Sequence, residues 1–471
     1  MSAETTITMV EKMKNSRAST LSLSSSSSLG RGDEEKKKEL ELLPEDDTTT
    51  TFGGSLYSPT ILSVLVSNLQ FEIPITAFLE LNPSDPTSFE SRLITAWPTI
   101  TEPARHTAQH TILRLLRQHY PTHPPPFGSV PFLHTSSGFL TITERLDPRL
   151  LPHLHTPLPN IPTIPRCSLN PLPLSRHSPK SWSSQIRLVT HPTSTSPLIA
   201  KGPSSSSSFT ELHTLLALPR HKHIMPAPTA LITVSTTNPR ICGFLLPYHA
   251  HGNLDTHATA LHAAGHLTAR KLADWTRQLI EALHWLHHTA GSFHGDLKPD
   301  NIILTSTSPE TLMLIDFSQD DYTAATAAPE VAGRWSVVEA GGRCVYTPPE
   351  KTERWTSNIG TATKMRDWPK EAREKAEVYA MGRTIAIVAS GVGMTELYMR
   401  LFEDGGYEYR TDAGEGGGGR AGAFVRRVVE ACTREAPGER CGLGELKEMC
   451  RAWEKAERGA RRRRKWSCGI L

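Results

Sequence analysis

The chain has 471 residues and a formal net charge of +3, from 51 lysines and arginines against 48 aspartates and glutamates. Two or three domains fit this length, and so balanced a charge argues against a protein that binds nucleic acid through its overall field. The seven cysteines form no CxxC pair, so we expect neither a zinc site nor a disulfide framework. We expect the protein to reside in a reducing compartment. Without a signal-like or membrane-length apolar run, we expect a protein that is neither secreted nor membrane-spanning.

The first part of the chain has two regions of contrasting composition. Residues 1–55 contain serine, lysine and threonine runs and few apolar side chains, which is typical of disorder. Apolar content rises over residues 56–151, where 61–78 favours strands and 102–120 favours an amphipathic helix. We therefore expect a small folded module over 56–151, with no function indicated. Residues 152–184 are rich in proline and serine, which predicts a linker.

After this linker the pattern changes to short strands and then to helices. Strand-like stretches lie near residues 185–189, 198–201 and 243–248, and a helix is expected over 209–218. Residues 267–290 have the strongest helical periodicity, with leucines on one face. The order predicts an α+β architecture in which a small strand-rich lobe is followed by a large helical lobe.

One loop after the long helix concentrates groups suited to phosphate transfer. It reads His-Gly-Asp-Leu-Lys-Pro-Asp-Asn over residues 294–301. The carboxylate of Asp296 can accept the proton of an attacking hydroxyl, and Lys298 can meet the charge that develops on the phosphate. The amide oxygen of Asn301 and the carboxylate of Asp316 are ligand types that Mg²⁺ prefers. The set predicts Mg²⁺-dependent phosphoryl transfer.

This loop resembles the H-R-D-L-K-P-x-N catalytic loop of protein kinases, and Asp316-Phe317-Ser318 resembles their D-F-G motif. Lys298 is similar to the lysine of Ser/Thr kinases rather than Tyr kinases. The resemblance covers about residues 185–455 and implies the bilobal protein kinase fold. It also implies ATP and Mg²⁺ as cofactors and a protein hydroxyl as the phosphate acceptor, with Asp296 as the catalytic base and Asn301 and Asp316 on the metal.

Upstream of the loop, the resemblance implies an ATP site. Lys201, at the end of Leu-Ile-Ala-Lys, resembles the lysine that holds the α- and β-phosphates, and Glu211 resembles its partner on the following helix. Phe244-Leu-Leu-Pro-Tyr248 is similar to the strand and hinge that carry adenine, with Leu246 in the gatekeeper position. The predicted ATP-binding residues are therefore Lys201, Glu211, Leu246 and Tyr248.

Downstream, two short motifs resemble a structural pair of the family. Tyr346-Thr-Pro-Pro-Glu350 resembles A-P-E, and Pro437-Gly-Glu-Arg440 resembles the late P-x-x-R. In the family these two ends form an internal ion pair, so Glu350 and Arg440 are expected to meet in a buried structural contact. The activation segment then ends at Glu350, and Arg343 stands where Ser/Thr kinases usually place a threonine beside the substrate.

The chain departs from the family pattern in several features besides Arg343, among them Ser318 in place of the glycine of D-F-G. No glycine occurs between Thr141 and Lys201, so the G-x-G-x-x-G loop that covers ATP is absent. Ile199 stands where the family prefers an alanine that packs above the adenine ring. The larger side chain is expected to narrow the adenine pocket. Gly295 replaces the arginine of H-R-D, the cation that a phosphorylated activation segment would bind, so activation by loop phosphorylation is not expected. Glu377 replaces the aspartate that begins a central helix.

The C-terminal residues 456–471 combine a basic run, Arg461 to Lys465, with Cys468 fourth from the end and leucine last. This C-a-a-X pattern predicts geranylgeranylation of Cys468, and basic residues add about 1 kcal/mol each at an anionic leaflet. We therefore expect a cytoplasmic protein with an anchor to the cytoplasmic face of a membrane. The alternatives are a chance cysteine on a basic tail, or a basic patch that directs import into the nucleus or binds nucleic acid.

The leading prediction is a Ser/Thr protein kinase that acts on a protein substrate and binds no specific nucleic acid. Two other functions remain open. A pseudokinase would use the fold as a binding or scaffold module; the missing glycine loop favours it, and retention of Asp296, Asn301 and Asp316 opposes it. A small-molecule phosphotransferase of related fold is disfavoured by the late glutamate and arginine pair, which belongs to kinases with protein substrates.

Overall fold

The computed structural model describes residues 51–58, 60–67, 75–120, 125, 127–136, 139–147, 156, 158, 160–172, 186–192, 194–202, 206–307, 309–317, 323, 325–333, 335–340, 343–347, 365–394 and 419–467. The predicted disordered segment lies outside these residues as far as residue 50. Glu350 and Cys468 also lie outside them.

The first sheet has five strands in the order β1-β2-β3-β4-β5. Its elements are β1 (Thr51–Ser58), β2 (Ile61–Ser67), β3 (Ile75–Glu80), α3 (Phe89–Ala96), η1 (Trp97–Thr99), α4 (Glu102–His119), β4 (Ser129–Ser136) and β5 (Phe139–Leu146). Strands β3 and β4 run parallel, and the two helices lie in the connection between them, as parallel pairing requires. Because β1 begins at residue 51, the prediction of disorder is wrong for residues 51–55.

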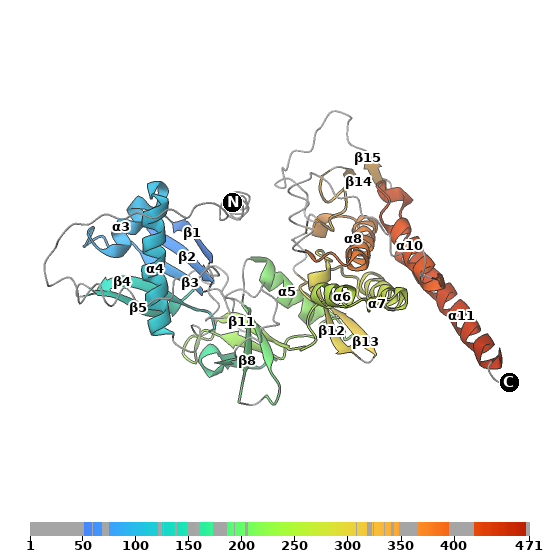
Figure 1. The fold of residues 1–471 in the computed structure, drawn as a ribbon, viewed down its shortest axis with the longest axis horizontal. Coiled ribbons are helices and arrows are strands. Elements are labelled where there is room, and N and C mark those ends of the chain that lie inside the picture. The colour runs from blue at the N-terminus through green and yellow to red at the C-terminus, as the bar shows by residue number, and fades with distance from the viewer. Residues whose placement is uncertain are drawn as a thin grey trace. The chain divides into compact units, whose positions relative to one another are not determined.

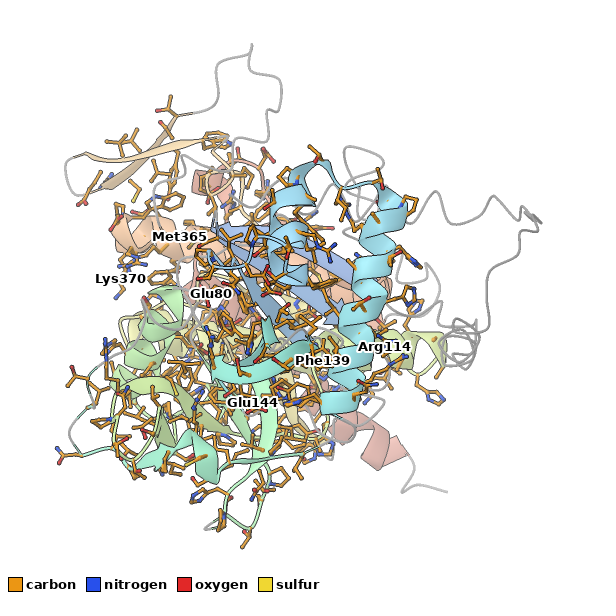
Figure 2. The ribbon with its side chains drawn as sticks, turned by 90° about the vertical axis from the view of Figure 1, so that its left-hand side faces the viewer. Glu80, Arg114, Phe139, Glu144, Met365 and Lys370 are labelled. Carbon is orange, nitrogen blue, oxygen red and sulfur yellow. The ribbon has the colours of Figure 1, made fainter. Side chains whose placement is uncertain are left out.

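Helix α4 covers this sheet with its apolar face. Ile112, Leu113 and Leu116 of α4 are buried in the same cluster as Leu62 and Leu79 of the strands, and Figure 1 shows α4 lying along the sheet. Figure 2 shows the side chains of this region. The helix predicted over 102–120 is present, and the stretch predicted as strand-like contains two antiparallel strands.

The second sheet has six strands in the order β6-β10-β11-β9-β8-β7. Its elements are β6 (Thr163–Pro165), η3 (Arg166–Ser168), β7 (Asn170–Pro171), β8 (Ile186–Thr190), β9 (Leu198–Lys201), α5 (Ser206–Ala217), β10 (Ala230–Thr233) and β11 (Ile241–Pro247). The predicted linker 152–184 therefore contains two strands of this sheet. Both lie at the edges, where the missing N–H of Pro165 and of Pro171 is tolerated, so a proline-rich sequence conceals them.

The segment before β4 also packs on the second sheet. Phe127 is buried in one cluster with Val189, Ala200 and Leu245. Nη1 of Arg187, a side chain of β8 that is 2% exposed, donates to the carbonyl oxygen of Pro125 at 2.8 Å. The strand-rich lobe is therefore stabilised by residues that precede the predicted domain boundary at 185.

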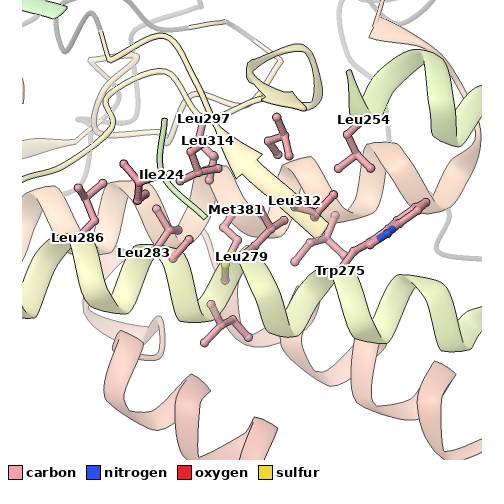
Figure 3. Close-up of a cluster of buried hydrophobic side chains, with 14 of the residues drawn as sticks. Ile224, Leu254, Trp275, Leu279, Leu283, Leu286, Leu297, Leu312, Leu314 and Met381 are labelled. Carbon is pink, nitrogen blue, oxygen red and sulfur yellow. The ribbon is translucent and has the colours of Figure 1, made fainter. Parts of the chain in front are cut away.

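The helical part of the chain is built around α7. Its elements are α6 (Leu254–Ala263), α7 (Ala269–His288), η4 (Pro299–Asn301), β12 (Ile302–Thr307), β13 (Glu310–Leu314), β14 (Ser336–Ala340), β15 (Arg343–Thr347), η5 (Met365–Asp367), α8 (Lys370–Ser390), α10 (Gly419–Cys432), η6 (Pro437–Glu439) and α11 (Leu443–Ser467). Thr268 begins α7 by accepting a hydrogen bond from the N–H of Lys271. Leu279, Leu283 and Leu286 of α7 are then buried in the main core (Figure 3). No described helix is long and apolar enough to span a bilayer.

The two lobes share one hydrophobic core, which fixes the position of the site. Leu212 and Leu215 of α5 are buried in the same cluster as Leu279 of α7. The N–H of Met225 donates to the carbonyl oxygen of Leu314 at 3.0 Å, which joins the first lobe to β13. The predicted α+β arrangement, a strand-rich lobe followed by a helical lobe, is confirmed by these elements.

Candidate active site

The loop between α7 and β12 brings its polar side chains to one point. Oδ2 of Asp296 accepts from Nζ of Lys298 at 2.6 Å and from Nδ2 of Asn301 at 3.2 Å. Asp296 is 5% exposed, and its Oδ1 is buried with no hydrogen-bond partner among the described residues. A buried carboxylate oxygen without a donor is costly, so Oδ1 has an acceptor capacity that the described residues leave unused.

Helix α8 fixes the backbone of this loop. Oε1 of Glu377 accepts from the N–H of His294 at 2.6 Å and from the N–H of Gly295 at 2.7 Å. Its Oε2 lies 2.5 Å from Nε2 of His287. Burial alone would raise the pKa of Glu377, but His287, His294 and Gly295 hold it below its ordinary value. The side chain of Glu377 is longer than the aspartate that the family has at this position. Its carboxylate contacts three partners in the core.

Gly295 has a backbone conformation that explains its identity. Its φ is +92°, in a region that costs an L side chain about 1–2 kcal/mol. Because glycine has no Cβ, the loop adopts this conformation without that strain. Because residue 295 is a glycine, this position of the loop carries no cation.

A second group of charges joins β9, α5 and the end of β13. Nζ of Lys201 lies 2.6 Å from Oε2 of Glu211 and 2.7 Å from Oδ1 of Asp316. Lys201 and Glu211 are buried, with side chains 15% and 2% exposed, whereas the side chain of Asp316 is 38% exposed. The structure thus brings together three residues predicted from distant parts of the sequence, and the carboxylate of Asp316 reaches the solvent side.

These contacts determine the charges of the group. Burial alone would lower the pKa of Lys201, but Glu211 and Asp316 raise it above its ordinary value, so the ammonium stays charged. Burial opposes ionisation of Asp316 as well, yet Lys201 holds its pKa below the ordinary range. Burial raises the pKa of Glu211 to about 7, against the effect of Lys201. Lys201 therefore presents a permanent cation beside an ionised carboxylate.

Asp316 and the residue after it are held in place by the core. Asp316 has φ of +67°, an uncommon conformation for a residue other than glycine. Phe317 is fully buried, and its ring lies 4.8 Å from that of His294. Nε2 of His294 lies 2.8 Å from the carbonyl oxygen of Ile315. The catalytic loop thus supports the segment that carries Asp316.

The predicted adenine side of the site is apolar. Leu246 of β11 pairs in register with Ile199 of β9 and is 6% exposed. Ile199, Tyr248 and Leu172 pack against Leu188, which is 8% exposed. Apolar side chains therefore line this side, and Ile199 is one of them.

The structure corrects the predicted position of the activation segment. Nη1 and Nη2 of Arg440 donate to Oε1 and Oε2 of Glu330 at 2.5 and 2.9 Å. Both side chains are fully buried. The carboxylate that meets Arg440 is therefore Glu330, and the prediction that Glu350 takes this place is wrong. The sequence did contain a signal for it, since Ala-Pro-Glu occurs literally at residues 328–330.

A second correction follows from this one. Arg343 lies in the hairpin of β14 and β15, where it is exposed, and not beside the catalytic loop. Thr323 takes that place, because its Oγ1 accepts from Nζ of Lys298 at 3.0 Å. The misplaced end of the segment caused this error, because it shifted every position counted back from that end.

Residues 199–391 match the family described as protein kinase domain. This part of the chain is therefore a protein kinase domain, with the charge clusters described above between its lobes. Comparison with curated proteins gives no match.

The donor groups fit the cofactors of protein kinases. Nδ2 of Asn301 is engaged by Asp296, so its oxygen is the atom suited to a metal, and Asp316 offers a partly exposed carboxylate. Hard oxygen ligands of this kind suit Mg²⁺. When bound, Mg²⁺ neutralises charge on the phosphates of ATP.

Proposed function

We propose that this protein is a Ser/Thr protein kinase that transfers the γ-phosphate of ATP to a protein hydroxyl. The observation that carries the proposal is the buried, unpartnered Oδ1 of Asp296 beside the ammonium of Lys298. A base held in this way can orient a hydroxyl and take its proton. A scaffold protein has no physical need for such a carboxylate.

The acceptor class rests on the neighbours of Asp296. Lys298 contacts both Asp296 and Thr323, at 2.6 and 3.0 Å. This lysine and threonine resemble those that Ser/Thr kinases place beside the substrate. This resemblance supports serine or threonine as the acceptor.

The reaction then follows from the residues. Oδ1 of Asp296 accepts the proton of the acceptor hydroxyl while the new O–P bond forms and the bond from the γ-phosphorus to the bridging oxygen breaks. Lys298 keeps Oδ2 in place and stabilises the charge that develops on the transferred group. Lys201 meets the phosphates of the departing ADP, held by Glu211.

Thermal unfolding of the full chain with MgATP tests nucleotide binding. Wild type should be stabilised, by about 2.7 kcal/mol at 100 times Kd, and Lys201→Met should lose this stabilisation. Lys222→Met is a matched control, because Lys222 is 58% exposed and pairs with Glu281. If MgATP at millimolar concentration leaves the wild-type midpoint unchanged, the kinase proposal fails.

A pseudokinase is the second candidate, and one observation favours it. Ile199 packs with Tyr248, Leu172 and Leu188 on the adenine side. If these side chains fill the adenine site, Ile199→Ala should create MgATP binding that wild type lacks. If wild type already binds, this candidate loses its support.

We also propose that the tail anchors the protein to an anionic membrane. Helix α11 continues to Ser467, so the basic run Arg461 to Lys465 lies on a helix that leads directly to Cys468. In cells, Cys468→Ser should move the protein from the membrane fraction to the supernatant, and Cys167→Ser, at an exposed cysteine outside the C-a-a-X pattern, should not. Equal fractionation of wild type and Cys468→Ser would contradict the anchor.

A further inference from the structure

We propose that Arg383 of α8 holds the described part of the activation segment in its working conformation, so that the kinase needs no phosphate on Thr323 or Thr326. This inference rests on the proposed function. It concerns the stretch from Asp316 to Glu330, which ends at the buried pair with Arg440.

The described threonines of the segment are poorly placed for modification. Thr323 is 6% exposed and Thr326 is 2% exposed. The carbonyl oxygen of Thr323 accepts from the N–H groups of Thr326 and Ala327 at 2.9 and 2.8 Å, and its hydroxyl is bound to Lys298. A phosphate on either threonine would have to break this packing, because a buried charge needs matched partners. Neither threonine therefore serves as a phosphate site in this conformation.

Residue 295 of the catalytic loop supplies no cation for such a phosphate. Gly295 stands at the position where the resemblance places arginine, and its φ of +92° disfavours any L side chain. Oε1 of Glu377 fixes this backbone through two N–H groups. Glycine at position 295 therefore suits the loop conformation and leaves this position without a cation.

Arg383 supplies a basic contact from another direction. It is half-buried on α8, and its Nε donates to the carbonyl oxygen of Ala325 at 3.2 Å. The next residue, Thr384, donates through Oγ1 to the carbonyl oxygen of Leu297 in the catalytic loop at 3.3 Å. Two successive residues of one rigid helix thus contact the activation segment and the catalytic loop, and they fix the two loops relative to each other.

Three basic side chains from different elements therefore hold the segment. Lys298 binds the side chain of Thr323, Arg383 binds the backbone at Ala325, and Arg440 binds the carboxylate of Glu330. The arrangement takes the place of the phosphate and arginine pair that orders such segments elsewhere.

The test compares three full-length variants with wild type. Arg383→Met removes the contact, Arg383→Lys keeps a cation of similar reach, and Arg373→Met is a control on the same helix. Arg373 is also half-buried but lies over the ring of Phe293, 4.8 Å from its centroid. Two readouts are needed: KM for the protein substrate against KM for ATP, and amide hydrogen exchange over residues 323–328.

Arg383→Met should raise KM for the protein substrate about tenfold, the factor set by about 1.4 kcal/mol, while KM for ATP stays within about twofold. In the same variant, amide exchange at 323–328 should speed up. Arg383→Lys should bring KM for the protein substrate and the exchange rate most of the way back to wild type, and Arg373→Met should change neither quantity. Wild type treated with a phosphatase should keep its activity. Unchanged exchange in Arg383→Met, or loss of wild-type activity after the phosphatase, would overturn the inference.

These outcomes separate the inference from the proposed function. If wild type transfers no phosphate, the kinase proposal fails, but hydrogen exchange still reports whether Arg383 orders the segment. If wild type is active and exchange in Arg383→Met equals that of wild type, the kinase proposal stands and only the role of Arg383 is overturned.

Discussion

Asp296→Asn should lower the rate of phosphate transfer at least about 100-fold, because an amide cannot accept the proton of the acceptor hydroxyl. The substitution keeps the shape of the side chain, and Lys298 and Asn301 still have an oxygen within reach. MgATP binding should therefore persist. The measurements are initial rates of phosphate transfer and the thermal midpoint with and without MgATP.

The control for this experiment is Asp300→Asn. Asp300 lies in the same loop, but its Oδ1 accepts from Nδ2 of Asn253 on the preceding part of the chain, and it has no hydrogen bond to Asp296 among the described contacts. Its substitution should leave most of the transfer rate. A rate for Asp296→Asn close to that of wild type would show that Asp296 is not the base.

Arg440→Met should be the most destabilising of the substitutions considered, with an expected loss of about 3–5 kcal/mol. It leaves the fully buried carboxylate of Glu330 without its partner. It also removes bonds from Arg440 to the carbonyl oxygens of Arg434 and Glu435. Urea unfolding of the full chain, followed by tryptophan fluorescence, measures the loss.

A double-mutant cycle makes this prediction specific. Glu330→Leu with Arg440→Met should lose less stability than the sum of the single variants, because the pair is then removed together. Glu350→Ala, at the glutamate that the sequence motif favoured, should cost much less than Glu330→Leu. Equal losses in these two variants would contradict the assignment of Glu330.

The sequence predicts best where the chemistry is local. Asp296, Lys298 and Asn301 lie within one loop, so their spacing alone brings them together, and the structure shows the contacts. Lys201 and Glu211 could be placed because strand and helix patterns surround them. The sequence did not predict the edge strands β6 and β7, because Pro165 and Pro171 give this stretch the composition of a linker.

The sequence predicts poorly where a contact joins distant segments. Two glutamates, Glu330 and Glu350, both follow a proline, and the local difference between them is the literal Ala-Pro-Glu that ends at Glu330. The decision lies in packing: the buried stretch around Ala325 and Ala328 brings Glu330 to the core. Arg383 likewise gives no signal in sequence, because its partner is a backbone carbonyl.

The most direct test is transfer of labelled γ-phosphate from ATP by the full-length protein to a generic basic protein and to itself, followed by identification of the phosphorylated residues. The account predicts incorporation that needs Mg²⁺, falls on serine or threonine and disappears in Asp296→Asn. Absence of incorporation where MgATP still stabilises the protein, or label on tyrosine alone, would contradict it.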